Sequence, residues 1–395
     1  MKPKASRLKV RLREVLRQIE RAEAVDASKV YRLLGVRWYG QGLFVREERV
    51  GADIAANRLY SVQPGDFVYN RLFAWKGSFA VAGAEASGAY VSNEFPCFAT
   101  DVTRLDPYFL LWFFRQQRAW TEVLGLSTGV TPTSRNRLKE SEFLAMEIAL
   151  PPLSEQQRVV ARIEELAARI NDARTLRQQA SGSAESLLVA MAHGWNSDQT
   201  EGRPVGWRRM RLSECVRLVD HSQRVSPDQR YPNLGIYSFG RGLFPKPPID
   251  GSVTSATTLR RVTAGQFIYS RLFAFEGAYG MVTEKYDGHF VSGEYPTFEC
   301  DPGLIRVEFL TAYFKAPSVW KDVSTGSKGL GHRRQRVQPE QLLRHPILVP
   351  PLAWQDRLAK VQVEINNLKN LQAESSVSLN ALLPAVLDRV FNGQP

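Results

Sequence analysis

Cysteine is scarce in this chain of 395 residues. Only Cys97, Cys215 and Cys300 are present. Their number is odd, they lie far apart, and no two of them have the close spacing of a zinc site or a redox motif. The sequence therefore excludes a disulfide framework and predicts no metal site, and we expect the three thiols to be small buried hydrophobic groups.

Long apolar runs are missing as well. No stretch approaches the roughly 18 uninterrupted apolar residues that a membrane-spanning helix needs. The first residues, Met1 to Lys4, lead into a charged amphipathic segment instead of an apolar signal core. We therefore expect a cytoplasmic protein with no membrane contact.

The sequence also lacks the motifs of common DNA-modifying enzymes. Adenine methyltransferases hold a flipped base with Asp or Asn followed by Pro-Pro and an aromatic residue, whereas the Pro-Pro pairs here follow Leu150, Lys246 and Val349. No lysine has an acidic residue two positions before it, and there is no Gly-Lys-Ser/Thr loop for phosphates. The five histidines are scattered without ligand spacing. We expect no catalytic residue and no bound cofactor in this chain.

Positive charge is abundant. Fifty-two Lys and Arg residues against 40 Asp and Glu residues give a formal net charge of +12. Such an excess favours a polyanionic partner, because binding releases the counterions of that partner. With a membrane excluded, the expected partner is nucleic acid. The hydrophobic content of 44% is that of a globular protein, and the length allows two or three domains.

The most informative feature is an internal repeat with a period of 200 residues. The segment Gly40 to Phe44 reads GQGLF and returns at Gly240 to Phe244 as GRGLF. Similarly, RLFA begins at both Arg71 and Arg271. The offset becomes 199 by the Pro-Pro-Leu sequences that end at Leu153 and Leu352, which indicates a change of loop length between the copies.

Each copy has two parts. The first part is rich in aromatic residues and glycine, with short runs typical of strands and an expected helix over Tyr108 to Gln116. The second part follows Pro-Pro and has the spacing of a long amphipathic helix, with Ser154 as the expected N-cap. We therefore predict an α+β protein in which similar mixed α/β domains, residues 1–150 and 199–349, alternate with helical spacers, residues 151–198 and 350–395.

The spacers have coiled-coil spacing. The predicted seam of the first helix is Val159, Ile163, Leu166, Ile170, Ala173, Ala180, Ala184, Leu187 and Met191, with Arg177 interrupting it. The predicted seam of the second is Leu358, Val361, Ile365, Leu368, Leu379, Leu382 and Val386. Two such stripes in one chain predict an intramolecular antiparallel pair of long helices. The alternative is that each helix packs separately on its own domain.

Two loops at matched positions have the composition of a nucleic-acid contact. Residues 127–137 contain hydroxyl groups and an Arg-x-Arg pair, and the copy at 324–336 keeps Thr-Gly and Arg-x-Arg while becoming more basic. Arginine suits guanine, and Ser, Thr and Lys suit phosphates. In the first loop the candidate DNA-binding residues are Thr128, Thr131, Thr133, Ser134, Arg135 and Arg137. In the second they are Thr325, Lys328, His332, Arg333, Arg334 and Arg336. A solvated turn without function is the alternative.

Arg71 and Arg271 are further candidates, since they occupy matched strands among apolar neighbours. They either read a base or tie two elements together through a carboxylate, and the matched pair Glu94 and Glu294 favours the second interpretation slightly. The rings of Tyr39, Trp75 and Phe244 can stack on bases, although aromatic residues near glycine more often belong to a core.

The segment Leu150 to Val160, LPPLSEQQRVV, resembles the opening of the helical spacer in specificity subunits of type I restriction-modification systems. The ending Leu382 to Gly393, LLPAVLDRVFNG, is similar to the tail of the second spacer in that family. The order of domain, spacer, domain and spacer extends the resemblance to the whole chain. Two segments depart from the pattern, Ala353 to Arg357 and Met191 to Trp195.

The resemblance implies two target-recognition domains that each read half of a split site in double-stranded DNA. It also implies a non-catalytic prokaryotic protein whose helices bind two methyltransferase subunits, with restriction subunits as possible additional partners. S-adenosylmethionine, ATP and magnesium would then belong to the partners. An antiparallel helix pair relates the domains by an approximate two-fold axis, as the strands of duplex DNA are related.

Two other functions remain open from the sequence. One is a tandem-domain adaptor that recruits proteins through its coiled coil. The other is an RNA-binding factor, although no aromatic RNA-binding motif is evident.

Overall fold

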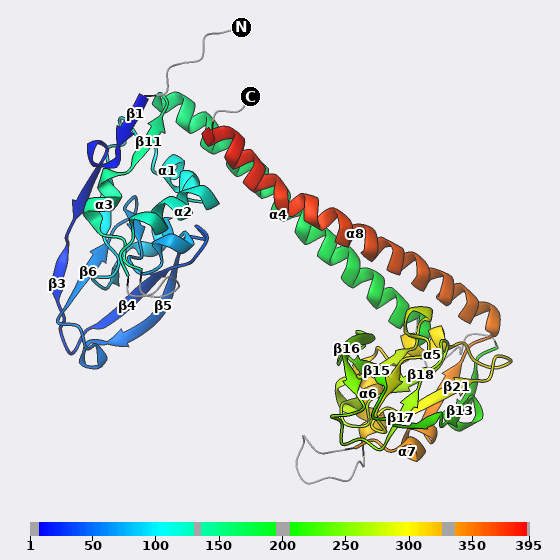
Figure 1. Cartoon of the computed structure of the whole chain (residues 1–395). Helices are drawn as coiled ribbons and strands as arrows, with labels where there is room; N and C mark the ends of the chain where they lie inside the picture. Colours follow the sequence, from blue (N-terminus) through cyan, green and yellow to red (C-terminus); the bar gives the residue numbers. More distant parts are fainter. Residues whose placement is uncertain (1–7, 130–135, 195–205, 326–335, 393–395) are drawn as a thin grey trace, which may run out of the picture. The chain divides into compact units, whose positions relative to one another are not determined.

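The repeat in the sequence returns as a repeat of secondary structure. The computed structural model describes residues 8–129, 136–194, 206–325 and 336–392. The chain divides into two units, residues 1–174 with 374–395 (unit 1) and residues 175–373 (unit 2). Each unit therefore holds one sheet domain together with part of both long helices (Figure 1).

The first repeat contains these strands and helices, with short 3-10 helices written η: β1 Leu8–Arg11, η1 Leu12–Glu14, β2 Leu16–Ile19, β3 Ala22–Ala24, β4 Val30–Val36, β5 Leu43–Val50, η2 Gly51–Asp53, β6 Arg58–Val62, β7 Phe67–Tyr69, η3 Ala74–Lys76, β8 Phe79–Val81, η4 Ala84–Ala86, β9 Ala89–Val91, β10 Cys97–Thr100, α1 Pro107–Phe113, α2 Gln117–Leu126, α3 Glu140–Ala145, β11 Glu147–Leu150 and α4 Leu153–Ala192.

The second repeat contains β12 Arg208–Arg211, η5 Leu212–Glu214, β13 Val216–Val219, β14 Ser222–Arg224, β15 Arg230–Ile236, β16 Leu243–Asp250, β17 Thr258–Arg261, β18 Phe267–Tyr269, η6 Ala274–Glu276, β19 Tyr279–Met281, η7 Glu284–Tyr286, β20 Phe290–Val291, β21 Thr297–Cys300, α5 Val307–Tyr313, α6 Pro317–Ser324, α7 Pro339–Leu343, β22 Pro346–Val349 and α8 Leu352–Asn392.

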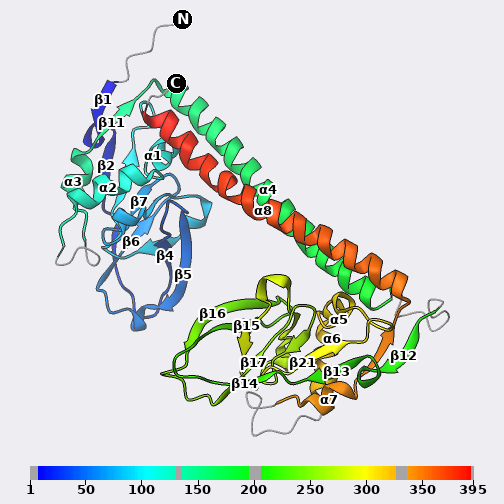
Figure 2. The same ribbon diagram turned by 45° about the vertical axis from the view of Figure 1, so that its right-hand side comes forward.

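The sheets have the same topology in both repeats. The first repeat forms sheets with the strand orders β1-β11, β2-β10-β7-β8 and β3-β6-β9-β4-β5, and the second forms β12-β22, β13-β21-β18-β19 and β14-β17-β20-β15-β16. Strand β4 pairs parallel to β9 and β15 pairs parallel to β20, while the other neighbours are antiparallel. The long hairpins β4–β5 and β15–β16 are visible in Figure 2. The predicted α+β class with two similar mixed domains is confirmed.

Aromatic side chains build the core between the four-stranded sheet and the short helices. Phe67, Phe79 and Phe114 are fully buried, and the rings of Phe79 and Phe114 stack with centroids 4.2 Å apart. In the second repeat Tyr279 and Phe314 form the equivalent contact at 4.5 Å. Burial of each such side chain stabilises the fold by roughly 1.5–3 kcal/mol. The aromatic richness noted in the sequence is therefore mainly core packing.

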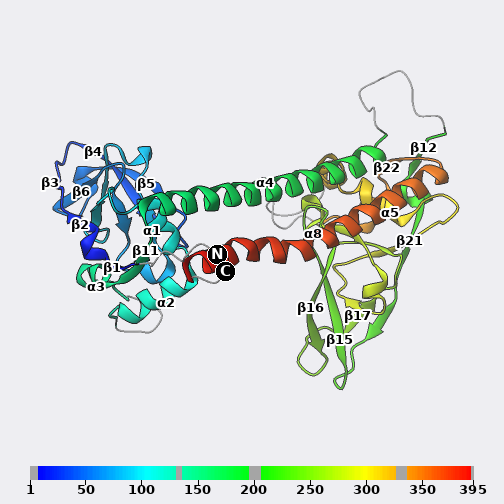
Figure 3. The same cartoon turned by 90° about the horizontal axis from the view of Figure 1, so that it is seen from above.

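Helices α4 and α8 pack together within each unit, as predicted, and they run antiparallel (Figures 1 and 3). In unit 1, Ile163 and Leu387 belong to the same buried cluster. In unit 2, Leu188 and Leu358 share another. The two helices have 40 and 41 residues, so neither is an independent short surface helix.

The detailed seam prediction for α4 is correct near the start of the helix, and further along it is correct at Ala184 and Met191 but wrong at Ala180 and Leu187. Ile163 and Ile170 are buried, but Leu187 is 36% exposed and Leu188 takes its place at 1%. The predicted Ala180 is exposed, and the neighbouring Ser181 contacts the other helix.

In α8 the predicted Leu368 and Leu382 are 42% and 50% exposed. Lys369 and Leu383 lie at the interface instead, with Lys369 paired to Glu185 of α4. The centre of the helix pair is polar, so apolar spacing could not define the register there.

The predicted N-cap is also wrong by two residues. Helix α4 begins at Leu153, and the N–H groups of Glu155 and Gln156 donate to the carbonyl oxygen of Pro152 at 2.8 and 3.1 Å. Ser154 therefore lies inside the first turn.

Within the described ranges, no helix is long and apolar enough to cross a membrane.

Candidate nucleic-acid interface

The bases of the two candidate loops are anchored in the same way. In unit 1 the backbone N–H of Leu138 donates to the carbonyl of Arg71 at 3.0 Å, and the buried hydroxyl of Tyr69 donates to the carbonyl of Leu138 at 3.3 Å. Burial raises the pKa of Tyr69, so the hydroxyl stays a donor. The strand β7 and the residues after it therefore hold the end of the first loop.

Unit 2 repeats this anchor. The N–H of Val337 donates to the carbonyl of Arg271 at 3.0 Å, and the hydroxyl of Tyr269 donates to the carbonyl of Val337 at 2.9 Å. The two loops therefore end at equivalent positions, even though their sequences differ.

Arg71 and Arg271 face carboxylates in the structure. Arg71 pairs with Glu140 and also donates to the carbonyl of Asn93, and its side chain is only 19% exposed. Arg271 Nε lies 3.8 Å from Glu294 Oε2, with the side chain 26% exposed. The geometry of these two arginines thus fits the tying role, with Glu140 in place of the expected Glu94 in unit 1.

Arg137 and Arg336 are more open. Each side chain is 43% exposed while it pairs with Glu94 or Glu294, at 3.2 Å in the second case. Thr128 exchanges backbone hydrogen bonds with Arg137 at 3.1 and 2.9 Å, which closes the base of the first loop. The Thr325 hydroxyl donates to the carbonyl of Lys321 at 2.8 Å. Each of the two guanidinium groups is thus held by a glutamate at the base of its loop, while much of the arginine side chain stays open to solvent.

The remaining candidates lie outside the described residues, and they are Thr131, Thr133, Ser134, Arg135, Lys328, His332, Arg333 and Arg334.

An aromatic turn lies beside the first loop anchor. The turn joins β4 to β5 over residues 37–42, and Tyr39 adopts a left-handed conformation with φ of +60°. Its N–H donates to the carbonyl of Lys76 at 2.8 Å. The ring of Trp38 packs against Phe73 at 5.4 Å, and Lys76 Nζ lies 3.9 Å from the centroid of Trp38. The aromatic rings and the Lys76 ammonium group therefore lie at the segment that follows Arg71.

Unit 2 has the same turn over residues 237–242. Phe239 has φ of +63°, and its N–H donates to the carbonyl of Glu276 at 2.7 Å. The cation here is Arg241, whose guanidinium lies 5.0 Å from the ring of Tyr237 and 5.9 Å from that of Phe239. The sequence made Tyr39 a candidate for base stacking with a core position favoured, and nothing in it singled out Phe239. Tyr39 and Phe239 share a left-handed backbone conformation, but an aromatic residue in a sequence gives no sign of that conformation.

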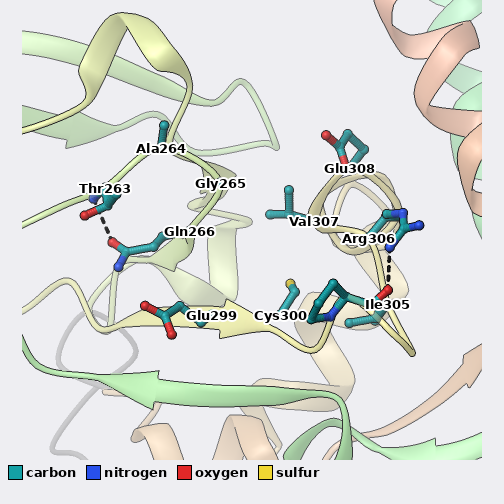
Figure 4. A pocket seen from close by; sticks show the side chains of 11 residues that line it. Thr263, Ala264, Gly265, Gln266, Glu299, Cys300, Ile305, Arg306, Val307 and Glu308 are labelled. Carbon is teal, nitrogen blue, oxygen red and sulfur yellow. Dashed lines mark hydrogen bonds between the residues drawn. The ribbon is translucent and has the colours of Figure 1, made fainter.

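A cavity of about 360 Å³ lies in unit 2 between the approach to β18, the end of β21 and the start of α5 (Figure 4). Glu299, Cys300 and Glu308 line it. Gln266 also lines it, and its side-chain oxygen accepts a hydrogen bond from the N–H of Thr263 at 2.9 Å. Burial raises the pKa of Cys300 to about 12, so its thiol is protonated and a poor nucleophile. These groups do not form a catalytic arrangement.

Among the residues that the structure describes, no three His, Cys, Asp or Glu side chains come together as a metal site. Cys97 and Cys215 are buried and Cys300 is half-buried.

No protein-family model matches the chain, and no curated protein sequence matches it. Solved structures do. The chain is similar to the HsdS subunit from Thermoanaerobacter tengcongensis, with a TM-score of 0.60 and 22% identity, over 98% of this chain and 97% of that one. It is also similar to a chain from a structure that addresses complex assembly and conformational transition of the type I R-M system, with a TM-score of 0.68 and 20% identity over 97% of both chains.

These similarities establish the fold. The chain has the fold of a type I restriction-modification specificity subunit, in which two similar sheet domains are each followed by a long helix and the two helices pack together. The resemblance noted in the sequence is confirmed at the level of fold.

Proposed function

We propose that this protein is the DNA-reading specificity subunit of a type I restriction-modification system. Each sheet domain reads one half of a bipartite site in double-stranded DNA. Helices α4 and α8 bind two methyltransferase subunits, and restriction subunits can join that complex. The protein has no catalytic role of its own and works in the cytoplasm of a prokaryote.

One observation carries the proposal: a full-length fold of this kind presents two loops that are anchored identically but differ in sequence. The same scaffold with different loops is what two unlike half-sites require. The net charge of +12 supports a polyanionic ligand. Arg137 and Arg336, each 43% exposed at the base of its loop, support a contact with that ligand in which a phosphate competes with the paired glutamate.

The test selects duplexes from a random pool with the full chain and then measures affinity against salt. We expect a bipartite consensus, and a logarithmic slope of about −0.9 for each phosphate that is neutralised. A protein-binding adaptor would select no sequence and show no steep slope, and an RNA-binding factor would prefer single-stranded or A-form RNA. Either result would contradict the proposal.

A second arm addresses catalysis and partners. With S-adenosylmethionine the purified chain alone should not methylate the selected duplex, and methylation should appear when co-purified methyltransferase subunits are present. Sequencing of methylated bases in the host would then report the same bipartite motif.

A further inference from the structure

We propose that Tyr39 and Phe239 are wedge residues, whose rings stack on a base at an unstacked step of the bound duplex, one in each half-site. The inference rests on the proposed function and adds to it a contact outside the two basic loops. The structural feature behind it is the left-handed aromatic turn that both units share.

The backbone provides the first argument. Among the described residues, Tyr39 and Phe239 are the two non-glycine residues with positive φ, at +60° and +63°. This conformation is unfavourable for an aromatic residue, and glycine or asparagine adopts it more easily. A ring persists at this position in both copies although the residue before it changes from Trp38 to Ser238. Strain that is retained at one place in this way is typical of functional sites.

Exposure provides the second argument. Tyr39 and Phe239 are 53% and 63% exposed, so burial of the rings does not offset the backbone strain. Each ring rests on one side against a tryptophan, with centroid distances of 5.5 Å to Trp120 and 6.3 Å to Trp320. The tryptophans in turn cover Gly77 and Gly277, where a Cβ atom would come within 2.4 Å of the ring. Each exposed ring is therefore supported by a tryptophan that is itself packed against the backbone.

Neighbouring charge indicates the kind of ligand. Lys76 lies over Trp38 in unit 1, and Arg241 lies beside Phe239 in unit 2, so each turn has a cation although it comes from a different position. At the position of Lys76, unit 2 has Glu276, which accepts a hydrogen bond from Ser238. A ring with an adjacent cation fits a base with its phosphate, and apolar wedges that unstack base steps are an established mode of duplex binding.

Position links the wedge to the loops. Tyr39 and Phe239 bind the backbone of η3 and η6, and these elements begin three residues after Arg71 and Arg271, whose carbonyls anchor the two loops. Each turn is therefore connected, through one short segment of the same unit, to the residue that anchors the basic loop. The wedge and the loop can act on one half-site.

The experiment uses the full chain and the duplexes that it selects from a random pool, with 2-aminopurine placed at one position of a half-site at a time. The variants are Tyr39→Gly, Tyr39→Phe and, as a control, Tyr108→Ala, because Tyr108 is a 43% exposed aromatic residue on α1. Phe239→Gly repeats the test for the other half-site.

We expect the unmodified chain and Tyr39→Phe to raise the fluorescence of the probe at one step, since an unstacked base is less quenched. Tyr39→Gly should bind about tenfold or more weakly and lose the fluorescence rise in one half-site only. Its melting temperature should stay equal or rise, because glycine adopts the left-handed conformation without strain. Tyr108→Ala should change neither binding nor fluorescence.

Three results would overturn the inference. The first is that Tyr39→Gly binds the duplex as tightly as the unmodified chain with the same fluorescence. The second is that its melting temperature falls together with its affinity for both half-sites, which would mean that the ring only covers Trp120. The third is that binding changes solely when a methyltransferase subunit is present, which would make the turn a protein contact. Failure of the unmodified chain to select any duplex would instead overturn the proposed function, before any variant is made.

Discussion

Gln156 binds Asp106 across the junction of α4 with the sheet domain of unit 1. Its Oε1 accepts a hydrogen bond from the N–H of Asp106 at 2.9 Å, and its Nε2 donates to the carbonyls of Arg104 and Pro151, both at 2.8 Å. The side chain is fully buried. This residue lies in the segment that resembles the family spacer, so the structure gives that segment a physical role: it fixes the first turn of the helix to the domain.

Gln355 repeats the junction in unit 2. It accepts from the N–H of Arg306 at 2.7 Å and donates to the carbonyls of Leu304 and Pro350 at 3.0 and 2.8 Å. Gln355 lies in the segment Ala353 to Arg357, which departs from the family pattern. In that segment Trp354 Nε1 donates to the carbonyl of Met191, at the end of α4, at 3.1 Å. The two departing segments therefore contact each other.

The first prediction concerns this junction. Gln156→Ala should destabilise unit 1 by about 1–3 kcal/mol, because it leaves the buried carbonyl of Pro151, together with the part-buried N–H of Asp106 and carbonyl of Arg104, without their partner. Gln157→Ala is the matched control, since Gln157 is the exposed neighbour on the same turn, and it should change stability by less than about 0.5 kcal/mol. Calorimetric unfolding of the full chain measures both. Equal effects of the two substitutions would contradict the assigned role.

The seam of the helix pair marks how far the sequence alone could predict the fold. The apolar positions before Ala173 predicted the buried face correctly, because Ile163 and Ile170 repeat at helical spacing. After Ala173 the residues that face α8 are Arg177 and Ser181, so two steps of four residues follow each other. A heptad pattern alternates steps of three and four residues, and the extra residue shifts the buried face forward by one position. Leu188, not Leu187, therefore faces the partner.

The site was predictable to a different degree. Matched loops pointed to Arg137 and Arg336, which lie open at the loop bases. The pairing of Arg71 with Glu140 joins residues 69 positions apart, and repeat matching favoured Glu94 because Glu294 corresponds to it. Only the three-dimensional packing of α3 brings Glu140 to Arg71. The same limit applies to Tyr39, whose backbone conformation depends on contacts with η3.

The second prediction concerns pH. The hydroxyl of Tyr313 lies 2.9 Å from Nε2 of the buried His345, and Nε2 of His193 donates to the carbonyl of Tyr313 at 3.1 Å. Burial lowers the pKa of both histidines below the ordinary 6.5. As pH falls below about 6.5, the unfolded chain takes up protons that the folded chain refuses, so unit 2 should lose stability. The loss should end once the lowered pKa values of the folded state are passed.

The double variant His345→Met with Tyr313→Phe tests this cause, because Met146 and Phe113 occupy the equivalent positions in unit 1. It should make the decline of melting temperature between pH 7 and 5.5 shallower, with the remaining part due to His193, and this range brackets the ordinary pKa. His221→Gln, at an exposed histidine, should leave the decline unchanged. A decline that persists in full in the double variant would assign it to other groups.

The third prediction separates the two half-sites. Replacement of Arg135 and Arg137 by alanine should impair recognition of one half-site, and replacement of Arg334 and Arg336 should impair the other. A base contact should cost about 1–3 kcal/mol at one base pair, whereas a phosphate contact should weaken binding to all sequences alike. Selection from a random pool by each variant reports which half of the consensus relaxes.

The control for charge is Arg162 and Arg169 on α4, whose side chains are 65% and 71% exposed. Their replacement by alanine removes the same two charges and should leave both halves of the consensus intact. If the two loop variants lost the same half-site, the assignment of one half-site to each domain would be wrong.

The last prediction concerns the spacer as a ruler. Helix α4 has 40 residues, or about 60 Å at 1.5 Å per residue, which is long enough to set the distance between half-sites. Arg174 lies opposite Asn380, with a hydrogen bond of 2.7 Å between their side chains.

Seven residues inserted after Ala173 and seven after Asn380 should therefore lengthen both helices at one level and keep the seam within about 20° of its register. The addition is about 10.5 Å, or at most about three base pairs, while both half-site sequences stay the same. Rotation of the duplex between the half-sites can make the increase smaller. An insertion into α4 alone is the control, and it should lower stability because α8 no longer matches it. Selection from a random pool measures the spacing, and an unchanged spacing with a folded, active double insertion would mean that the helices do not set it.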